Sequence, residues 1–107
     1  MRTSFTFRHM DSTDALKNHT LDKLQRLSRY EDHELSIHAI YSVEKRHMTV
    51  EFTVTANSNT FVCSETREDM YEAIDVAVDK LDRQLRRDKT KRKHHKGQQG
   101  SVPDQIG

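Results

Sequence analysis

Two stretches in which apolar residues occupy every second position, separated by a short polar connection, constrain the fold of this chain more than any other feature. Their apolar positions are Leu35, Ile37, Ala39, Tyr41 and Val43 in the first stretch, and Met48, Val50, Phe52, Val54 and Ala56 in the second. Because successive side chains of a strand point to opposite faces, both stretches predict strands with one apolar face. The Glu44-Lys45-Arg46 connection is short enough for an antiparallel hairpin. The apolar face of this hairpin requires a second layer to cover it.

The flanking segments supply two more strands and two helices. Phe5 and Phe7 alternate with polar residues, as in a half-buried strand. The Asp11-Ser12-Thr13 sequence can cap a helix whose buried positions are Leu16, Thr20, Leu24 and Leu27. Residues 60–64 are short and β-branched, which favours a fourth strand after a turn at residues 57–59, and Glu68 then opens the last helix. The sequence therefore predicts a two-layer α+β fold in the order βαβββα, a four-stranded sheet with two helices on one face.

The last helix has three chemically distinct faces at about 100° per residue. Its predicted core stripe is Tyr71, Ile74, Val78, Leu81 and Leu85, its basic face is Lys80, Arg83, Gln84, Arg87 and Lys91, and its acidic face is Glu68, Glu72, Asp75, Asp79 and Asp82 with Arg86 among them. This separation predicts that one side of the helix packs into the fold while two charged sides remain at its flanks.

A strong local charge is hidden by a near-neutral total. Residues 80–96 contain nine Lys or Arg and two Asp, a local charge of +7 within a chain whose formal net charge is +1. Basic charge of this density attracts phosphate through Coulomb force and counterion release, which indicates a polyanionic partner such as RNA. A solvated basic helix end, favoured by the helix dipole, is the alternative that charge alone leaves open.

Length and composition limit the number of domains, the cellular location and the kinds of site that this chain can have. A chain of 107 residues is long enough for one domain, expected over residues 1–92, with a basic and then flexible tail over residues 93–107. No apolar run is long enough for a secretory signal or a membrane span, so we expect a cytoplasmic protein. Cys63 has no base beside it, and His94-His95 has no carboxylate or thiolate partner, so neither an enzyme nor a metal site is predicted, and no cofactor is expected.

Several segments of the chain resemble one known family. They are Asp69-Met70-Tyr71, Ala73-Ile74-Asp75, Asp79-Lys80-Leu81 and Arg83-Gln84-Leu85 in the last helix, and Thr13-Asp14-Ala15-Leu16 and the 22–27 segment in the first. They resemble the ribosome hibernation-promoting factor and ribosome-associated inhibitor A family, also called the sigma-54 modulation protein family. The resemblance implies the same βαβββα fold, which is itself similar to a double-stranded RNA-binding domain. The chain departs from the family pattern at Phe7, Ser12, Thr20 and Glu65.

The resemblance also implies a function without chemistry. A member would bind the small ribosomal subunit between head and body, contact 16S rRNA, occlude the mRNA channel and tRNA positions, and stabilise idle 70S ribosomes in stationary phase or stress. The short acidic-poor tail favours the hibernation-promoting type, which is linked to ribosome dimers, and the free protein is expected to be a monomer. A general double-stranded RNA-binding module remains the alternative.

The same resemblance implies which residues contact RNA. The matching positions are Lys23, Arg26 and Arg29 on the first helix, and Lys80, Arg83, Arg86 and Arg87 on the second, with Lys89, Lys91 and Arg92 extending the path. Two helices in one layer could present these two basic edges to a single groove.

Overall fold

The computed structural model describes residues 1–30, 35–56 and 59–97, and describes side chains within these ranges except those of Tyr30 and residues 88–97. The elements follow the predicted order: β1 (Arg2–Arg8), α1 (Asp14–Leu24), the 3₁₀ segment η1 (Gln25–Tyr30), β2 (Leu35–Glu44), β3 (His47–Ala56), β4 (Asn59–Arg67) and α2 (Met70–Gly97). The predicted turn at Asn57 and Ser58 lies outside the described residues.

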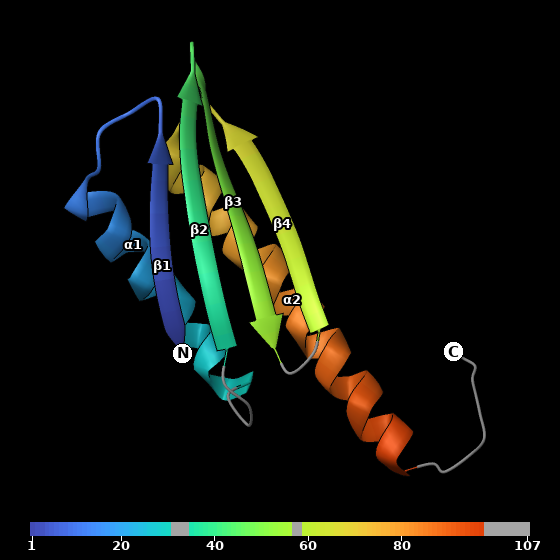
Figure 1. Ribbon diagram of the computed structural model, residues 1–107. Coiled ribbons are helices and arrows are strands. Elements are labelled where there is room, and N and C mark those ends of the chain that lie inside the picture. The colour runs from blue at the N-terminus through green and yellow to red at the C-terminus, as the bar shows by residue number, and fades with distance from the viewer. Residues whose placement is uncertain (31–34, 57–58, 98–107) are drawn as a thin grey trace.

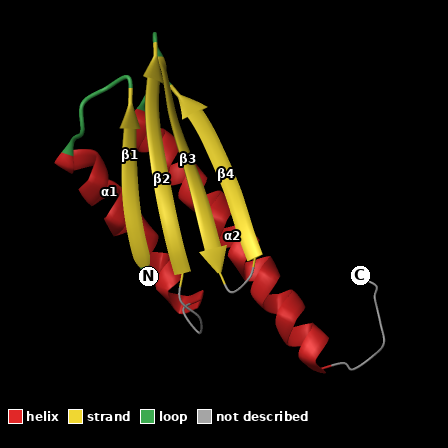
Figure 2. Ribbon diagram, viewed as in Figure 1, coloured by secondary structure: helices red, strands yellow, loops and turns green. Residues whose placement is uncertain are grey.

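The four strands form one mixed sheet in the order β1-β2-β3-β4. The β1 and β2 strands are parallel, and the β2–β3 and β3–β4 pairs are antiparallel. Both helices lie on one side of this sheet, with α2 crossing behind β3 and β4 and extending past their ends (Figures 1 and 2). The opposite face carries polar side chains such as Ser4, His38 and Thr53, which share one register across three strands. The α+β fold predicted from the alternation is therefore confirmed.

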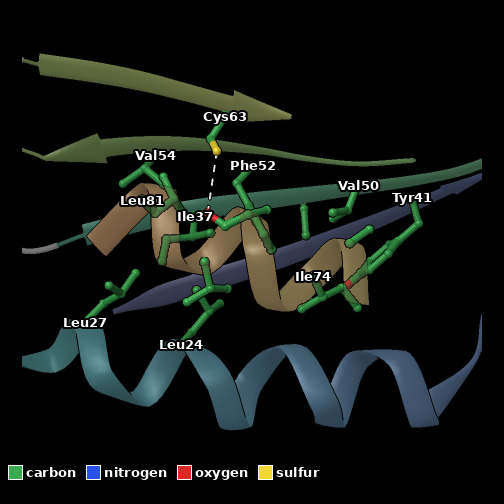
Figure 3. Close-up of a cluster of buried hydrophobic side chains, with 14 of the residues drawn as sticks. Leu24, Leu27, Ile37, Tyr41, Val50, Phe52, Val54, Cys63, Ile74 and Leu81 are labelled. Carbon is green, nitrogen blue, oxygen red and sulfur yellow. Dashed lines mark hydrogen bonds between the residues drawn. The ribbon is translucent and has the colours of Figure 1, made fainter. Parts of the chain in front are cut away.

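The core forms where the apolar face of the hairpin meets α1 and α2 (Figure 3). The predicted inward positions of the hairpin are buried from Leu35 to Tyr41 and from Val50 to Ala56, while Val43 and Met48 pack partly buried at the hairpin end. Phe7 stacks on Tyr41 with ring centroids 4.6 Å apart, so this large aromatic fills core space next to the parallel edge strand.

Local sequence explains how each helix begins. Thr13 caps α1, because its side chain accepts a hydrogen bond from the Leu16 backbone N–H at 3.2 Å. Asp69 serves α2 in the same way, accepting from the Tyr71 backbone N–H at 3.0 Å. The second helix therefore begins at Met70 and not at Glu68, as the sequence had suggested.

Two expectations about the core are corrected by the structure. Tyr71 does not belong to the core stripe, since 42% of its surface is exposed and its ring instead packs in a T-shaped arrangement with the His19 ring, with centroids 4.9 Å apart. Met70, Ala73 and Ala77 are buried beside the predicted stripe, because α2 packs against both the sheet and α1 and buries a broader face than one stripe. The α2 helix continues to Gly97, and the division into a domain over residues 1–92 and a tail over residues 93–107 stays a prediction.

Candidate nucleic-acid interface

The two charged sides of α2 face different neighbours. Lys80, Arg83 and Arg87 line a groove with β4, whereas Asp75, Asp79 and Asp82 form ion pairs with α1 and η1. This confirms that the helix has separate basic and acidic sides. The placement also decides which side can receive an anion, because the acidic side is already matched by basic residues of the same chain.

The groove between β4 and α2, hereafter the β4 groove, has a volume of about 360 Å³. It is lined by Val62, Cys63, Ser64, Lys80, Arg83, Gln84 and Arg87. Arg83 and Arg87 are exposed, and neither forms an ion pair with any residue whose side chain the structure describes. An open groove lined by Arg83 and Arg87, with Lys80 held at its rim by Glu65, is suited to a phosphate-bearing ligand.

Glu65 controls the position of Lys80 at the rim of the β4 groove. It lies on the helix-facing side of β4 with only 8% of its surface exposed, and its two carboxylate oxygens contact Lys80 Nζ and, at 2.7 Å, Arg67 Nη1. The hydrogen bond from Lys80 lowers the pKa of this carboxyl group, so Glu65 is ionised at neutral pH. These contacts let β4 continue to Arg67, three residues beyond the predicted strand, because the inward-facing acid has cationic partners.

Cys63 and Gln84 form the inner part of the β4 groove. The Cys63 thiol is 6% exposed and donates to the Ala77 carbonyl at 3.5 Å (Figure 3), and burial raises its pKa. A protonated, shielded thiol is a poor nucleophile, so Cys63 packs here as a small apolar residue. The Gln84 Oε1 atom is buried and finds no hydrogen-bond partner within the described part of the chain.

A row of ion pairs joins the other side of α2 to the first helical segment. At one end, His19 Nε2 lies 2.7 Å from Asp75 Oδ1. Further along, Arg26 contacts Asp79 at 2.6 Å and Asp82 at 2.8 Å, and the hydrogen bond with Asp82 is the main cause of its raised pKa. We call this row the α1–α2 seam.

Asp82 lies at the end of the α1–α2 seam that is rich in arginine. Its carboxylate is 1% exposed and accepts from Arg26 at 2.8 Å, from Arg29 at 2.9 and 3.0 Å, and from Arg86 at 3.2 Å. A buried carboxylate requires such partners, since leaving it unpaired would cost several kcal/mol. The sequence pattern placed Asp82 on an acidic surface, and its burial became evident only from the packing of η1 against α2.

The residues predicted to contact RNA therefore fall into distinct groups. Arg83, Arg87 and Lys80 line the β4 groove, whereas Arg26, Arg29 and Arg86 surround Asp82. The two groups lie on different sides of α2, because the arginines of η1 face its acidic side, and the presentation of both basic edges to one groove of RNA stays a prediction. Lys23 is half-buried in α1, and the side chains of Lys89, Lys91 and Arg92 lie outside the described part of the structure.

Other kinds of site receive no support from the described residues. No group of three or more His, Cys, Asp or Glu residues there is arranged to hold a metal ion. His38 is placed by two hydroxyl groups of β1, with Ser4 Oγ at 2.6 Å and Thr6 Oγ1 at 2.9 Å. Among the described helices, none is long and apolar enough to cross a lipid bilayer.

Comparisons of sequence and of structure with known proteins agree on one family. Residues 3–93 match the family model described as Sigma 54 modulation protein / S30EA ribosomal protein. The chain is 39% identical to the ribosome hibernation promoting factor of Azotobacter vinelandii, over 96% of this chain and 94% of that protein. It is 34% identical to the factor of the same name from Escherichia coli, over 89% of this chain and 100% of that protein. The solved structure of a ribosomal subunit interface protein from Coxiella burnetii is similar with a TM-score of 0.77 at 30% identity, covering 84% of this chain and 99% of that one.

Proposed function

Because the chain belongs to the Sigma 54 modulation protein / S30EA ribosomal protein family, a non-enzymatic class, we propose that it is a ribosome hibernation factor that acts by occupying the ribosome. It binds the small ribosomal subunit in the decoding and mRNA channel, contacts 16S rRNA and blocks access of tRNA and mRNA. By filling this space it stabilises inactive 70S ribosomes in the cytoplasm during stationary phase or stress. The names of the relatives support the ribosome as the partner.

The observation that carries the proposal is the β4 groove. Lys80, Arg83 and Arg87 lie on the exposed side of one rigid helix. The neighbouring strand β4 contributes no acidic residue to the lining of the groove. Fixed cations on a helix attract phosphate without ordering a loop, so the ligand does not have to meet that entropic cost.

The length of α2 supports a binding path longer than the groove. The helix continues past the sheet to Gly97 and brings Lys89, Lys91 and Arg92 onto the same element (Figure 1). Contacts from Lys and Arg to phosphates fix position and affinity, while base-specific contacts are needed to read sequence. We therefore propose that this protein recognises the shape and charge of ribosomal RNA.

Sedimentation of purified ribosomes with the protein through a sucrose gradient tests the proposal. The wild type is expected to travel with small subunits and 70S ribosomes, and the fraction of dimeric ribosomes shows whether it belongs to the dimer-forming type. The double variant Arg83→Glu with Arg87→Glu should remain at the top of the gradient, because it places two negative charges in the β4 groove.

The control carries the same change of charge at a distant site. Lys45→Glu with Arg46→Glu alters the exposed β2–β3 hairpin connection and should co-sediment like the wild type. Absence of the wild type from every ribosomal fraction would refute the proposal. Equal affinity for free duplex RNA and small subunits would instead favour a general double-stranded RNA-binding module.

A further inference from the structure

Three arginines from two elements converge on the Asp82 carboxylate. Arg26 and Arg29 belong to η1, and Arg86 follows Asp82 by one turn of α2. In a 3₁₀ helix, which has three residues per turn, residues three apart lie directly above one another. The switch from α1 to η1 at Gln25 therefore brings Arg26 and Arg29 to the same side, facing α2.

The cluster combines a buried acid with exposed bases. The Asp82 side chain is 1% exposed, whereas the side chains of Arg26, Arg29 and Arg86 are 42%, 56% and 59% exposed. Arg26 also contacts Asp79 at 2.6 Å, so its guanidinium group is shared between two carboxylates, while Asp82 contacts all three arginines. Because the acid lies beneath the arginines, an approaching anion meets the positive groups first.

We propose that Asp82 is a positioning residue that fixes Arg26, Arg29 and Arg86 as one receptor for the phosphates of an RNA backbone, separate from the β4 groove. This inference rests on the proposed function. Guanidinium groups recognise phosphate through pairs of N–H donors held in a planar fork, so their orientation affects affinity as well as their charge. Hydrogen bonds to Asp82 restrict the three side chains before RNA arrives and reduce the rotamer entropy lost on binding.

The role of Asp82 can be distinguished from a simple effect of charge. Replacing an acid with a neutral residue makes the surface more positive, and electrostatics alone then predicts tighter binding to RNA. Positioning predicts weaker binding, because the arginines lose their common anchor. The two explanations therefore differ in the sign of the change in affinity.

The matched pair of variants is Asp82→Asn and Asp79→Asn. Both remove one negative charge from the same side of α2, but Asp79 is 55% exposed and contacts Arg26 alone among the three arginines. Binding to purified small ribosomal subunits should weaken about tenfold or more for Asp82→Asn, since three rotamer-rich side chains must then be ordered during binding. Asp79→Asn should bind as tightly as the wild type or more tightly.

A second variant keeps the test decisive if Asp82→Asn is unstable. Arg26→Lys with Arg29→Lys and Arg86→Lys preserves every charge but removes the planar forks. Its affinity for subunits should also fall, and Asp82→Glu should restore part of the binding lost in Asp82→Asn. Near-ultraviolet circular dichroism identifies the temperatures at which each variant is folded.

The outcomes separate this inference from the proposed function. If folded Asp82→Asn binds subunits as tightly as Asp79→Asn, or if the triple lysine variant binds like the wild type, Asp82 does not position a phosphate receptor, and the ribosome-binding proposal still stands. If the wild type itself fails to bind subunits, the proposed function is overturned and this inference with it.

Discussion

A buried pair of hydroxyl groups allows the packing between α1 and the sheet to be tested quantitatively. Thr20 and Tyr41 are both 0% exposed, and their oxygen atoms lie 2.6 Å apart. The Thr20 hydroxyl also donates to the Leu16 carbonyl at 2.8 Å. Since a threonine hydroxyl has one hydrogen, the Tyr41 hydroxyl must be the donor to Thr20.

The direction of this hydrogen bond predicts an asymmetry between two substitutions. Thr20→Val keeps the shape but leaves the Tyr41 O–H buried without an acceptor, which should cost about 1–3 kcal/mol. Tyr41→Phe removes the donor, and Thr20 keeps its bond to Leu16, so the cost should be only about 0.5–1.5 kcal/mol. In the double variant no tyrosine hydroxyl remains to be satisfied, so its cost should be clearly less than the sum of the two single costs.

Thermal and urea denaturation followed by circular dichroism measure these free energies of unfolding. A change of 1 kcal/mol should shift Tm by roughly 4–8 °C in a domain of this size. The reasoning is refuted if Thr20→Val is no more destabilising than Tyr41→Phe, or if the two costs simply add. Either result would mean that the two hydroxyl groups do not share a hydrogen bond of the inferred direction.

Three further outcomes follow from ionisable groups in the core and at the β4 groove. Lys80 lowers the pKa of Glu65, so the ionised Glu65 carboxylate contributes fully to stability above the unfolded pKa of about 4.3. This contribution is lost as the pH falls through the lower folded pKa. In urea titrations, Glu65→Gln should therefore lose less stability than the wild type between pH 7 and pH 3. Burial raises the pKa of Tyr41 to about 12, so between pH values of about 10 and about 12 the unfolded chain releases this proton while the folded chain retains it. The alkaline loss of stability of the wild type in this range should be reduced in Tyr41→Phe. Cys63 should react with iodoacetamide far more slowly in the native protein than in urea, and equal rates in a mass-spectrometric time course would contradict its burial and raised pKa.

Patterns formed by residues close together in the sequence were sufficient to predict the architecture. The alternation through Tyr41 and Phe52 fixed which side of the hairpin is buried, since a strand has a period of two. The family resemblance agreed with this pattern, and the match over residues 3–93 confirms it. Thr20, which departs from the family pattern, was still assigned correctly to the buried side of the first helix from its spacing.

Predictions failed where a side chain has two possible environments. Tyr71 has the spacing of a core residue, but it lies at the outer edge of the contact between α1 and α2, where the packing leaves it half-exposed. The predicted fourth strand covered only the β-branched and aromatic residues 60–64, whereas β4 continues through Glu65, a charged residue whose position facing a helix layer would be costly in isolation. Its actual cost is offset by Lys80 and Arg67, and Lys80 lies on an element that only the folded chain brings near.

The sequence alone determined the order of the elements, the buried face of the hairpin and the basic side of the last helix, because periodicity and local charge are properties of neighbouring residues. The tertiary structure alone decided how the charges are used. Asp82 and Arg29 are 53 residues apart in the chain, and no local pattern indicates that one is buried beneath the other. Folding brings α2 beside η1, where the cost of burying the Asp82 carboxylate is offset by three guanidinium groups, and it leaves Arg83 and Arg87 on the opposite side of α2 with the β4 groove open beside them.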